Sequence, residues 1–186
     1  MESWKNIYQK KLVTADEAVK HIPNHARVFF GHAANEPPVL VDALVRNYEQ
    51  YEDVEITHWV PMGKGEYCDP KEGRADYTPF FYHQSTRFFS DGTYPIDVAL
   101  VSVTPPDEHG FVSLGVSVGG TKPAVLNAKL AIAQVNDQMP RTMGDSFLHV
   151  SQFDYFVEAS TPLPELGGGA IDEVTDAIGK NIAQLV

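Results

Sequence analysis

Three short segments rich in glycine and small residues could bring backbone N–H groups against a substrate oxygen. They are Gly31-His32-Ala33-Ala34, residues 61–65 (PMGKG) and residues 117–120 (SVGG). Close approach of backbone donors suits binding of a carboxylate or stabilisation of an oxyanion. Ordinary tight turns remain the alternative, because no segment has the glycine spacing of a phosphate-binding loop.

A fourth segment, Ser85-Thr86-Arg87, offers two hydroxyls and a guanidinium group, which together could clamp a carboxylate. A surface turn is the alternative. Lys64, between two glycines, could neutralise an anion or be solvated, but its neighbours lack the spacing of a Walker loop.

The chain offers no convincing catalytic residue of its own. Ser102, Ser113 and Ser117 fall in expected strands and lack the G-x-S-x-G pattern of a nucleophile elbow. Acidic neighbours favour the protonated thiol of Cys68. The histidines lack metal-ligand spacing, so we expect no metal site, and only His32 is a candidate site residue.

Helical and strand patterns alternate along the chain and predict an α/β fold with a mostly parallel sheet flanked by helices. A capping box begins at Thr14, and Pro37 or Pro38 suits the first turn of a helix. The expected strands are residues 27–31, 54–60, 96–103, 111–118 and 129–135, and the expected helices are residues 14–23, 37–45, 121–128 and 171–185. Since parallel strands end at one edge, the glycine-rich segments should meet there.

The last expected helix carries Ile171, Val174, Ile178, Ile182 and Leu185 at helical spacing. Its apolar face needs a partner surface. We therefore expect residues 1–186 to form one N-terminal domain, with residues 170–186 linking it to a C-terminal domain. We also expect a homo-oligomer.

Composition narrows the class of protein. The 186 residues are 43% hydrophobic and 21% charged, as in a globular domain. The net charge of −11 argues against nucleic acid as a partner. No apolar run is long enough for a membrane span, the first residues lack a signal peptide's apolar stretch, and there is a single cysteine. These features predict a cytoplasmic protein that does not bind membranes.

Three consecutive segments resemble the acetyl-CoA hydrolase/transferase family of class I coenzyme A transferases. They are Ile96 to Val103 (IDVALVSV), Pro106 to Phe111 (PDEHGF) and Gly115 to Gly119 (GVSVG). Further matching stretches, in order along nearly the whole chain, are residues 14–19, 36–41, 63–67, 85–87, 135–138, 149–151 and 156–158. The chain is most similar to the 4-hydroxybutyrate and butyrate coenzyme A transferases.

The resemblance implies two α/β halves of the NagB/RpiA/CoA-transferase architecture. It implies transfer of coenzyme A from an acyl-CoA (4-hydroxybutyryl-, butyryl- or acetyl-CoA) to a short carboxylic acid such as acetate. A glutamate would carry coenzyme A as a thioester. Members are about twice as long, and that glutamate lies in their second half, so no catalytic residue is assigned here. Coenzyme A is a substrate, and no permanently bound cofactor is expected.

Position in the family's motifs also implies a set of residues that border the substrate. They are Gly31, His32, Ala33, Glu36, Gly63, Gly65, Ser85, Thr86, Arg87, Ser117 and Gly119. Members usually carry a further segment, which we expect to be missing between Ser90 and Asp91.

Other functions stay open at this point. An acetyl-CoA hydrolase half would let water replace the acceptor acid. A binding module without chemistry would be a stable monomer with no large exposed apolar face. A sugar-phosphate isomerase on the same architecture is disfavoured by the acidic charge and the lack of a phosphate loop.

Overall fold

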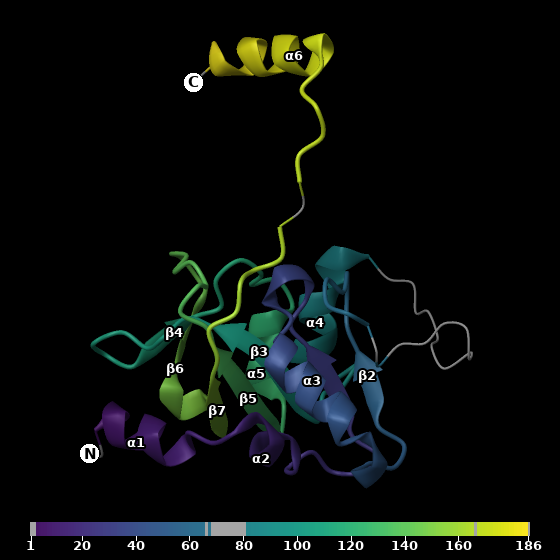
Figure 1. Ribbon diagram of the computed structural model, residues 1–186, viewed down its shortest axis with the longest axis vertical. Coiled ribbons are helices and arrows are strands. Elements are labelled where there is room, and N and C mark those ends of the chain that lie inside the picture. The colour runs from purple at the N-terminus through teal and green to yellow at the C-terminus, as the bar shows by residue number, and fades with distance from the viewer. Residues whose placement is uncertain (1–2, 66, 68–80, 166, 186) are drawn as a thin grey trace.

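A five-stranded, fully parallel sheet forms the centre of the computed structural model, which describes residues 3–65, 67, 81–165 and 167–185 (Figure 1). Its strands are β1 (Arg27–Phe30), β2 (Glu55–Thr57), β3 (Val98–Val103), β5 (Leu130–Val135) and β7 (Tyr155–Glu158). They lie in the order β2-β1-β3-β5-β7. The chain leaves β1 toward β2 on one side and builds β3, β5 and β7 on the other, so the topological switch point lies between β1 and β3.

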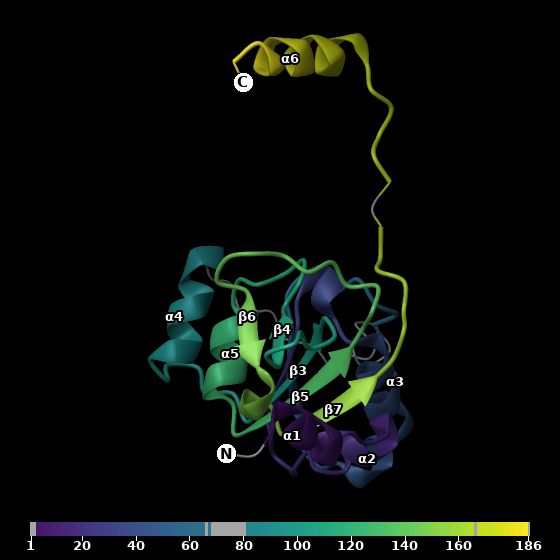
Figure 2. The same cartoon turned by 90° about the vertical axis from the view of Figure 1, so that its left-hand side faces the viewer.

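Helices cover both faces of this sheet (Figures 1 and 2). They are α1 (Trp4–Lys11), α2 (Ala15–Val19), α3 (Pro38–Arg46), α4 (Ser85–Ser90) and α5 (Thr121–Asn127), with short 3-10 turns at Ala33–Asn35, Tyr48–Gln50, Tyr82–Gln84 and Val150–Gln152. Helices α2 and α3 pack together on one face, and α4 and α5 pack together on the other. This confirms the α/β class expected from the sequence.

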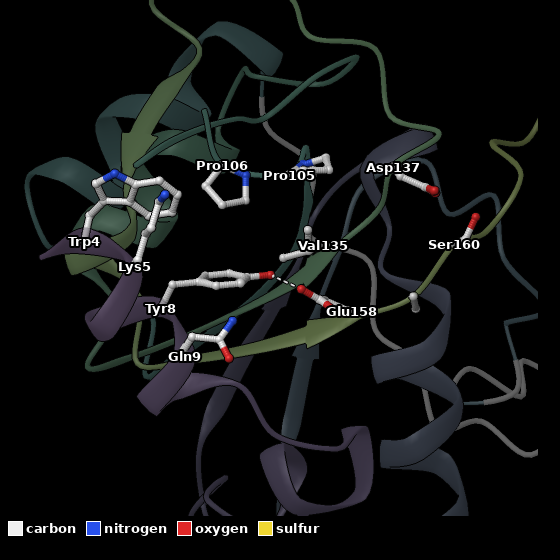
Figure 3. Close-up of a pocket in the computed structure, with 11 residues that line it drawn as sticks. Trp4, Lys5, Tyr8, Gln9, Pro105, Pro106, Val135, Asp137, Glu158 and Ser160 are labelled. Atoms are coloured by element: carbon white, nitrogen blue, oxygen red, sulfur yellow. Dashed lines mark hydrogen bonds between the residues drawn. The ribbon is translucent and has the colours of Figure 1, made fainter. Parts of the chain in front are cut away.

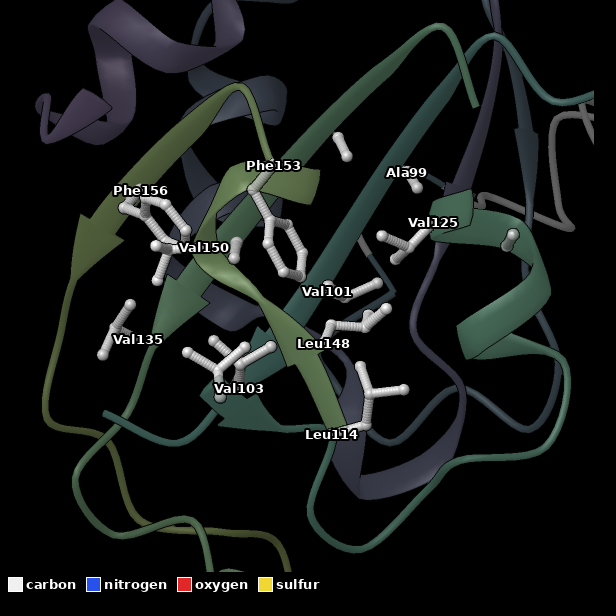
Figure 4. Packing of buried hydrophobic residues seen from close by; sticks show 14 of the residues in the cluster. Ala99, Val101, Val103, Leu114, Val125, Val135, Leu148, Val150, Phe153 and Phe156 are labelled. Carbon is white, nitrogen blue, oxygen red and sulfur yellow. The ribbon is translucent and has the colours of Figure 1, made fainter. Parts of the chain in front are cut away.

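The alternation of side chains along β3 explains the two cores. Val98 and Leu100 point into the cluster under α2 and α3, whereas Ala99, Val101 and Val103 point into the opposite cluster. Figure 4 shows the second cluster, in which Phe153 and Phe156 fill the space beside these small β3 side chains. All six β3 residues are buried, as expected for a central parallel strand.

Helices α2 and α3 begin at the residues that the sequence predicts. The Thr14 hydroxyl accepts the Glu17 N–H, and the Glu17 carboxylate accepts the Thr14 N–H, so the capping box is formed. Pro38 occupies the first turn of α3, where its missing N–H removes no helical bond.

The strand expected over residues 111–118 is shorter than predicted and lies outside the main sheet. Strand β4 covers only Phe111–Ser113 and pairs antiparallel with β6 (Phe147–His149), outside the main sheet. Gly115 has φ +64°, a left-handed conformation that ends the extended run. Ser117 therefore lies in a loop and not on a strand.

Helix α6 (Glu173–Ala183) stands apart from the sheet at the end of an extended connector (Figures 1 and 2). Each of its side chains is exposed, including those of Val174, Ile178 and Ile182. The helix and its apolar stripe were expected. Within the described residues, no helix is both long enough and apolar enough to cross a bilayer.

Candidate functional site

The segment after β1 is fixed at the switch point by a buried amide. Asn35 is fully buried, and its side-chain N–H groups donate to the carbonyls of Ser102 and Leu114, each at 2.7 Å. A Cβ on Gly31 would lie 2.2 Å from the Asn35 Oδ1, so only glycine fits there. The amide thus holds the end of β1 beside the end of β3. Sequence reasoning missed Asn35, although it lies between two of the predicted site residues.

Glu36 joins the segment after β1 to the segment after β2. Its Oε2 accepts the backbone N–H groups of Met62 at 3.1 Å and Gly63 at 3.0 Å. The carboxylate is buried, and a Cβ on Gly63 would lie 2.3 Å from the Glu36 Oε1. The structure brings Glu36 and Gly63 together, as expected. The N–H groups of Met62 and Gly63, however, donate to Glu36 and not to a substrate oxygen.

His32 lies at the centre of a polar chain. Its Nε2 is 2.8 Å from the Tyr82 hydroxyl, and its Nδ1 is 3.2 Å from the Thr121 hydroxyl. Burial lowers the pKa of His32, so the ring is held neutral near pH 7. Sequence reasoning found His32 but neither of its partners. In the sequence, Tyr82 is one residue of the aromatic run at positions 80–83 (FFYH), which does not single it out.

Two glycines allow the side chains of this cluster to pack closely. A Cβ on Gly119 would lie 2.6 Å from the Tyr82 hydroxyl, and a Cβ on Gly120 would lie 2.3 Å from the Trp59 ring. The Trp59 ring is 5.5 Å from the His32 ring. The structure thus brings Gly119 to His32, so the first and third glycine-rich segments meet.

Three further residues predicted from the sequence lie in the loops after the strands. Ala33 has φ +49° in the turn after β1, Gly65 has φ +68°, and Ser117 is half-buried two residues before Gly119. The Lys64 side chain pairs with Asp42 at 3.4 Å.

Ser85, Thr86 and Arg87 form the first turn of α4 and do not converge as a clamp. The Ser85 hydroxyl donates to the Tyr82 carbonyl at 2.7 Å and is buried. Arg87 is exposed and pairs with Asp91 at 3.2 Å, one helical turn along. The segment therefore supports the Tyr82 backbone, while the guanidinium faces solvent.

A separate cavity of about 620 Å³ lies at the same edge of the sheet but against α1 (Figure 3). Its walls include Trp4, Pro105 and Val135, and the Tyr8 hydroxyl donates to Glu158 at 2.8 Å across its floor. None of the predicted site residues lines it. Helix α1 was not predicted, although the apolar spacing of Trp4, Ile7 and Tyr8 would have indicated it.

The described residues contain no group of three His, Cys, Asp or Glu side chains placed to hold a metal ion. Cys68 lies outside the described residues. The cluster at the switch point therefore supplies glycine-flanked loops, one neutral histidine, one tyrosine hydroxyl and one buried carboxylate. Such a site can bind and orient a small acyl group, and no side chain in it is placed as an activated nucleophile.

A parallel sheet with glycine-rich loops at its switch point is typical of α/β domains that bind small molecules there, and a family model identifies the kind of domain. The model described as the acetyl-CoA hydrolase/transferase N-terminal domain matches residues 1–71 and 62–164. The chain belongs to this family. The two parts of the match overlap at residues 62–71, and the second part runs across Ser90 and Asp91. The segment expected to be missing between Ser90 and Asp91 stays a prediction.

Individual relatives agree with this family. The chain is 48% identical over 204 aligned positions to the 4-hydroxybutyrate coenzyme A transferase of Clostridium kluyveri, covering 98% of this chain and 48% of the relative. It is 31% identical to the butyryl-CoA:acetate CoA-transferase of Anaerostipes caccae, covering 99% of this chain and 47% of the relative. The chain spans about half the length of these curated relatives.

The fold is shared with a solved structure from the same group of proteins. The 4-hydroxybutyrate CoA-transferase of Porphyromonas gingivalis superposes with a TM-score of 0.84 at 34% identity, over 99% of this chain and 48% of that one. The NagB/RpiA/CoA-transferase-like architecture expected from the resemblance is consistent with this match.

Proposed function

We propose that this chain is the N-terminal half of a CoA-transferase. The enzyme moves coenzyme A between an acyl-CoA, such as 4-hydroxybutyryl-, butyryl- or acetyl-CoA, and a short carboxylic acid such as acetate. The observation that carries the proposal is the 48% identity to a 4-hydroxybutyrate coenzyme A transferase across 98% of the chain. The cluster of His32, Glu36, Trp59, Tyr82 and Gly119 forms its side of the acyl site.

A carboxylate outside this chain performs the covalent chemistry. It attacks the thioester carbonyl, which gives a mixed anhydride and releases the coenzyme A thiolate. The thiolate then attacks the carbonyl of the enzyme's own carboxylate, which gives an enzyme thioester and releases the first acid. An acceptor acid reverses these steps. The chain's contribution is to bind and orient the acyl group.

Two features support the assignment of the nucleophile to another half. The one carboxylate in the cluster, Glu36, is buried against two backbone N–H groups. The apolar stripe of α6 is exposed over Val174, Ile178 and Ile182, as for a surface that packs against further polypeptide or a second copy. We therefore propose that residues 170–186 lead into a C-terminal half.

An exchange assay tests the proposal. Isotope transfer between acyl-CoA and acetate is measured with this chain alone and with the intact enzyme, formed by this chain and the proposed C-terminal half. We expect exchange only by the intact enzyme. Exchange by residues 1–186 alone would contradict the proposal, and release of free coenzyme A without transfer to acetate would indicate a hydrolase instead.

A further inference from the structure

The hydrogen-bond chain through His32 fixes the direction in which each group donates. Thr121 is fully buried, and within the described part of the chain His32 is the hydrogen-bond partner of its hydroxyl. A buried hydroxyl proton needs an acceptor. Donation to the His32 Nδ1, at 3.2 Å, satisfies it. The proton of the neutral imidazole then resides on Nε2.

The Nε2–H of His32 therefore donates to the Tyr82 phenolic oxygen at 2.8 Å. Burial lowers the pKa of His32, which keeps the ring in this neutral form. Because Tyr82 accepts this bond, its own proton is left to donate elsewhere, and the described residues hold no acceptor for it. Tyr82 is 57% exposed over the whole residue, so a bound ligand can contact this side chain.

Gly119 lets the hydroxyl pack closely against the backbone. A Cβ there would lie 2.6 Å from the Tyr82 oxygen and 3.0 Å from the His32 ring, so a glycine is needed for this hydrogen-bonded pair to lie so close. Trp59 supplies an apolar wall, with its ring 5.9 Å from the Tyr82 ring. The site thus places one hydrogen-bond donor beside an apolar surface, which suits an alkyl chain that ends in a hydroxyl.

The charges around this donor argue against a ligand with a terminal carboxylate. The buried Glu36 carboxylate belongs to the same loop as His32. On the flanking segments, Lys64 pairs with Asp42 and Arg87 pairs with Asp91. A second carboxylate would meet like charge, whereas a neutral hydroxyl would not.

We propose that Tyr82, oriented by the Thr121–His32 pair, determines acyl specificity by donating a hydrogen bond to the hydroxyl oxygen of a 4-hydroxyacyl chain. This inference rests on the proposed CoA-transferase function. A site that binds a substrate hydroxyl discriminates strongly against the analogue that lacks it. The proposal therefore predicts that the enzyme prefers 4-hydroxybutyryl-CoA to both butyryl-CoA and succinyl-CoA.

The test uses the intact enzyme and measures kcat/KM with 4-hydroxybutyryl-, butyryl- and succinyl-CoA. In Tyr82→Phe, the preference for 4-hydroxybutyryl- over butyryl-CoA should fall by about 10-fold or more. Thr121→Val removes only the hydroxyl that places the His32 proton on Nε2. This variant should lower the same ratio by a smaller factor. Tyr155→Phe is the matched control, because its hydroxyl also faces a histidine, His21 at 3.4 Å, at the opposite edge of the sheet.

Each result has one meaning. An unchanged ratio in Tyr82→Phe would overturn the specificity proposal, and so would a wild-type enzyme that prefers succinyl-CoA. A wild-type enzyme that exchanges none of the three acyl groups would instead refute the proposed function. An equal change in Tyr155→Phe would show that loss of any tyrosine hydroxyl has this effect, which also contradicts the proposal.

Discussion

The Glu36 carboxylate holds the N–H group of Gly63 at 3.0 Å, across two loops that are separated by a whole strand and helix. The same oxygen accepts the Met62 N–H at 3.1 Å. One buried side chain therefore sets the spacing between the loops that follow β1 and β2. Both loops border the proposed acyl site, so their spacing should control activity as well as stability.

Glu36→Ala should lower the free energy of unfolding by about 1–3 kcal/mol, because two backbone N–H groups lose their acceptor. Glu36→Gln should lower it less, since the amide oxygen can take the place of Oε2. Urea denaturation of the chain measures both. Equal stability of the alanine variant and the wild type would show that the loops are held by other contacts.

The chain should lose stability as the pH falls from 7 to 5.5. Burial lowers the pKa of His32 and of His58, so the folded state stays neutral while the unfolded histidines take up protons near pH 6.5. Each contributes up to about 1 kcal/mol to the loss over this range. In His32→Gln the free energy of unfolding should fall less steeply with decreasing pH, as measured by denaturation at each pH. An unchanged slope would contradict a neutral His32.

At high pH the Tyr8 hydroxyl governs a second loss of stability. Burial, aided by the bond to Glu158, raises the pKa of Tyr8 above its ordinary value of 10.0. The neutral form therefore stabilises the fold fully below pH 10, and this contribution is lost as the unfolded state ionises above it. Between pH 9 and pH 11, wild type should lose about 1 kcal/mol more than Tyr8→Phe in denaturation experiments. An equal loss of unfolding free energy in both proteins would argue against a Tyr8 that stays neutral in the folded state.

The exposed stripe of α6 should cause self-association of the isolated chain. Ile178→Asp with Ile182→Asp should give a monomer in light scattering and leave the melting temperature unchanged, because neither side chain packs on the sheet. Lys180→Asp, on the same helix, serves as a control for added charge. A wild-type chain that is monomeric at high concentration would show that this stripe does not drive association.

The main sheet was predictable because its strands follow strong local patterns. Residues 96–103 and 129–135 are nearly continuous apolar runs, and they form β3 and β5. Strand β7 and helix α1 were missed, since Tyr155–Glu158 is short and α1 buries only Tyr8. They pack against each other, with the Tyr8 and Phe156 rings 4.8 Å apart, and this contact joins segments that lie far apart in the sequence.

The candidate site was predictable only in part, for a similar reason. Glycine-rich strand ends identified Gly31, His32 and Gly119. The partners that give these residues a role, Tyr82 and Thr121, are 50 and 89 positions from His32, and only the fold brings them together. The motif Ser85 to Arg87 resembled a clamp because its residue types suit one. Helix geometry instead turns Arg87 toward Asp91.

The location of the enzyme thioester tests the central claim most directly. The intact enzyme is incubated with 4-hydroxybutyryl-CoA, digested under acidic conditions, and the peptide that carries coenzyme A is sequenced by mass spectrometry. We predict that the adduct lies on a glutamate outside residues 1–186. An adduct on Glu36, or on any other residue of this chain, would contradict the account.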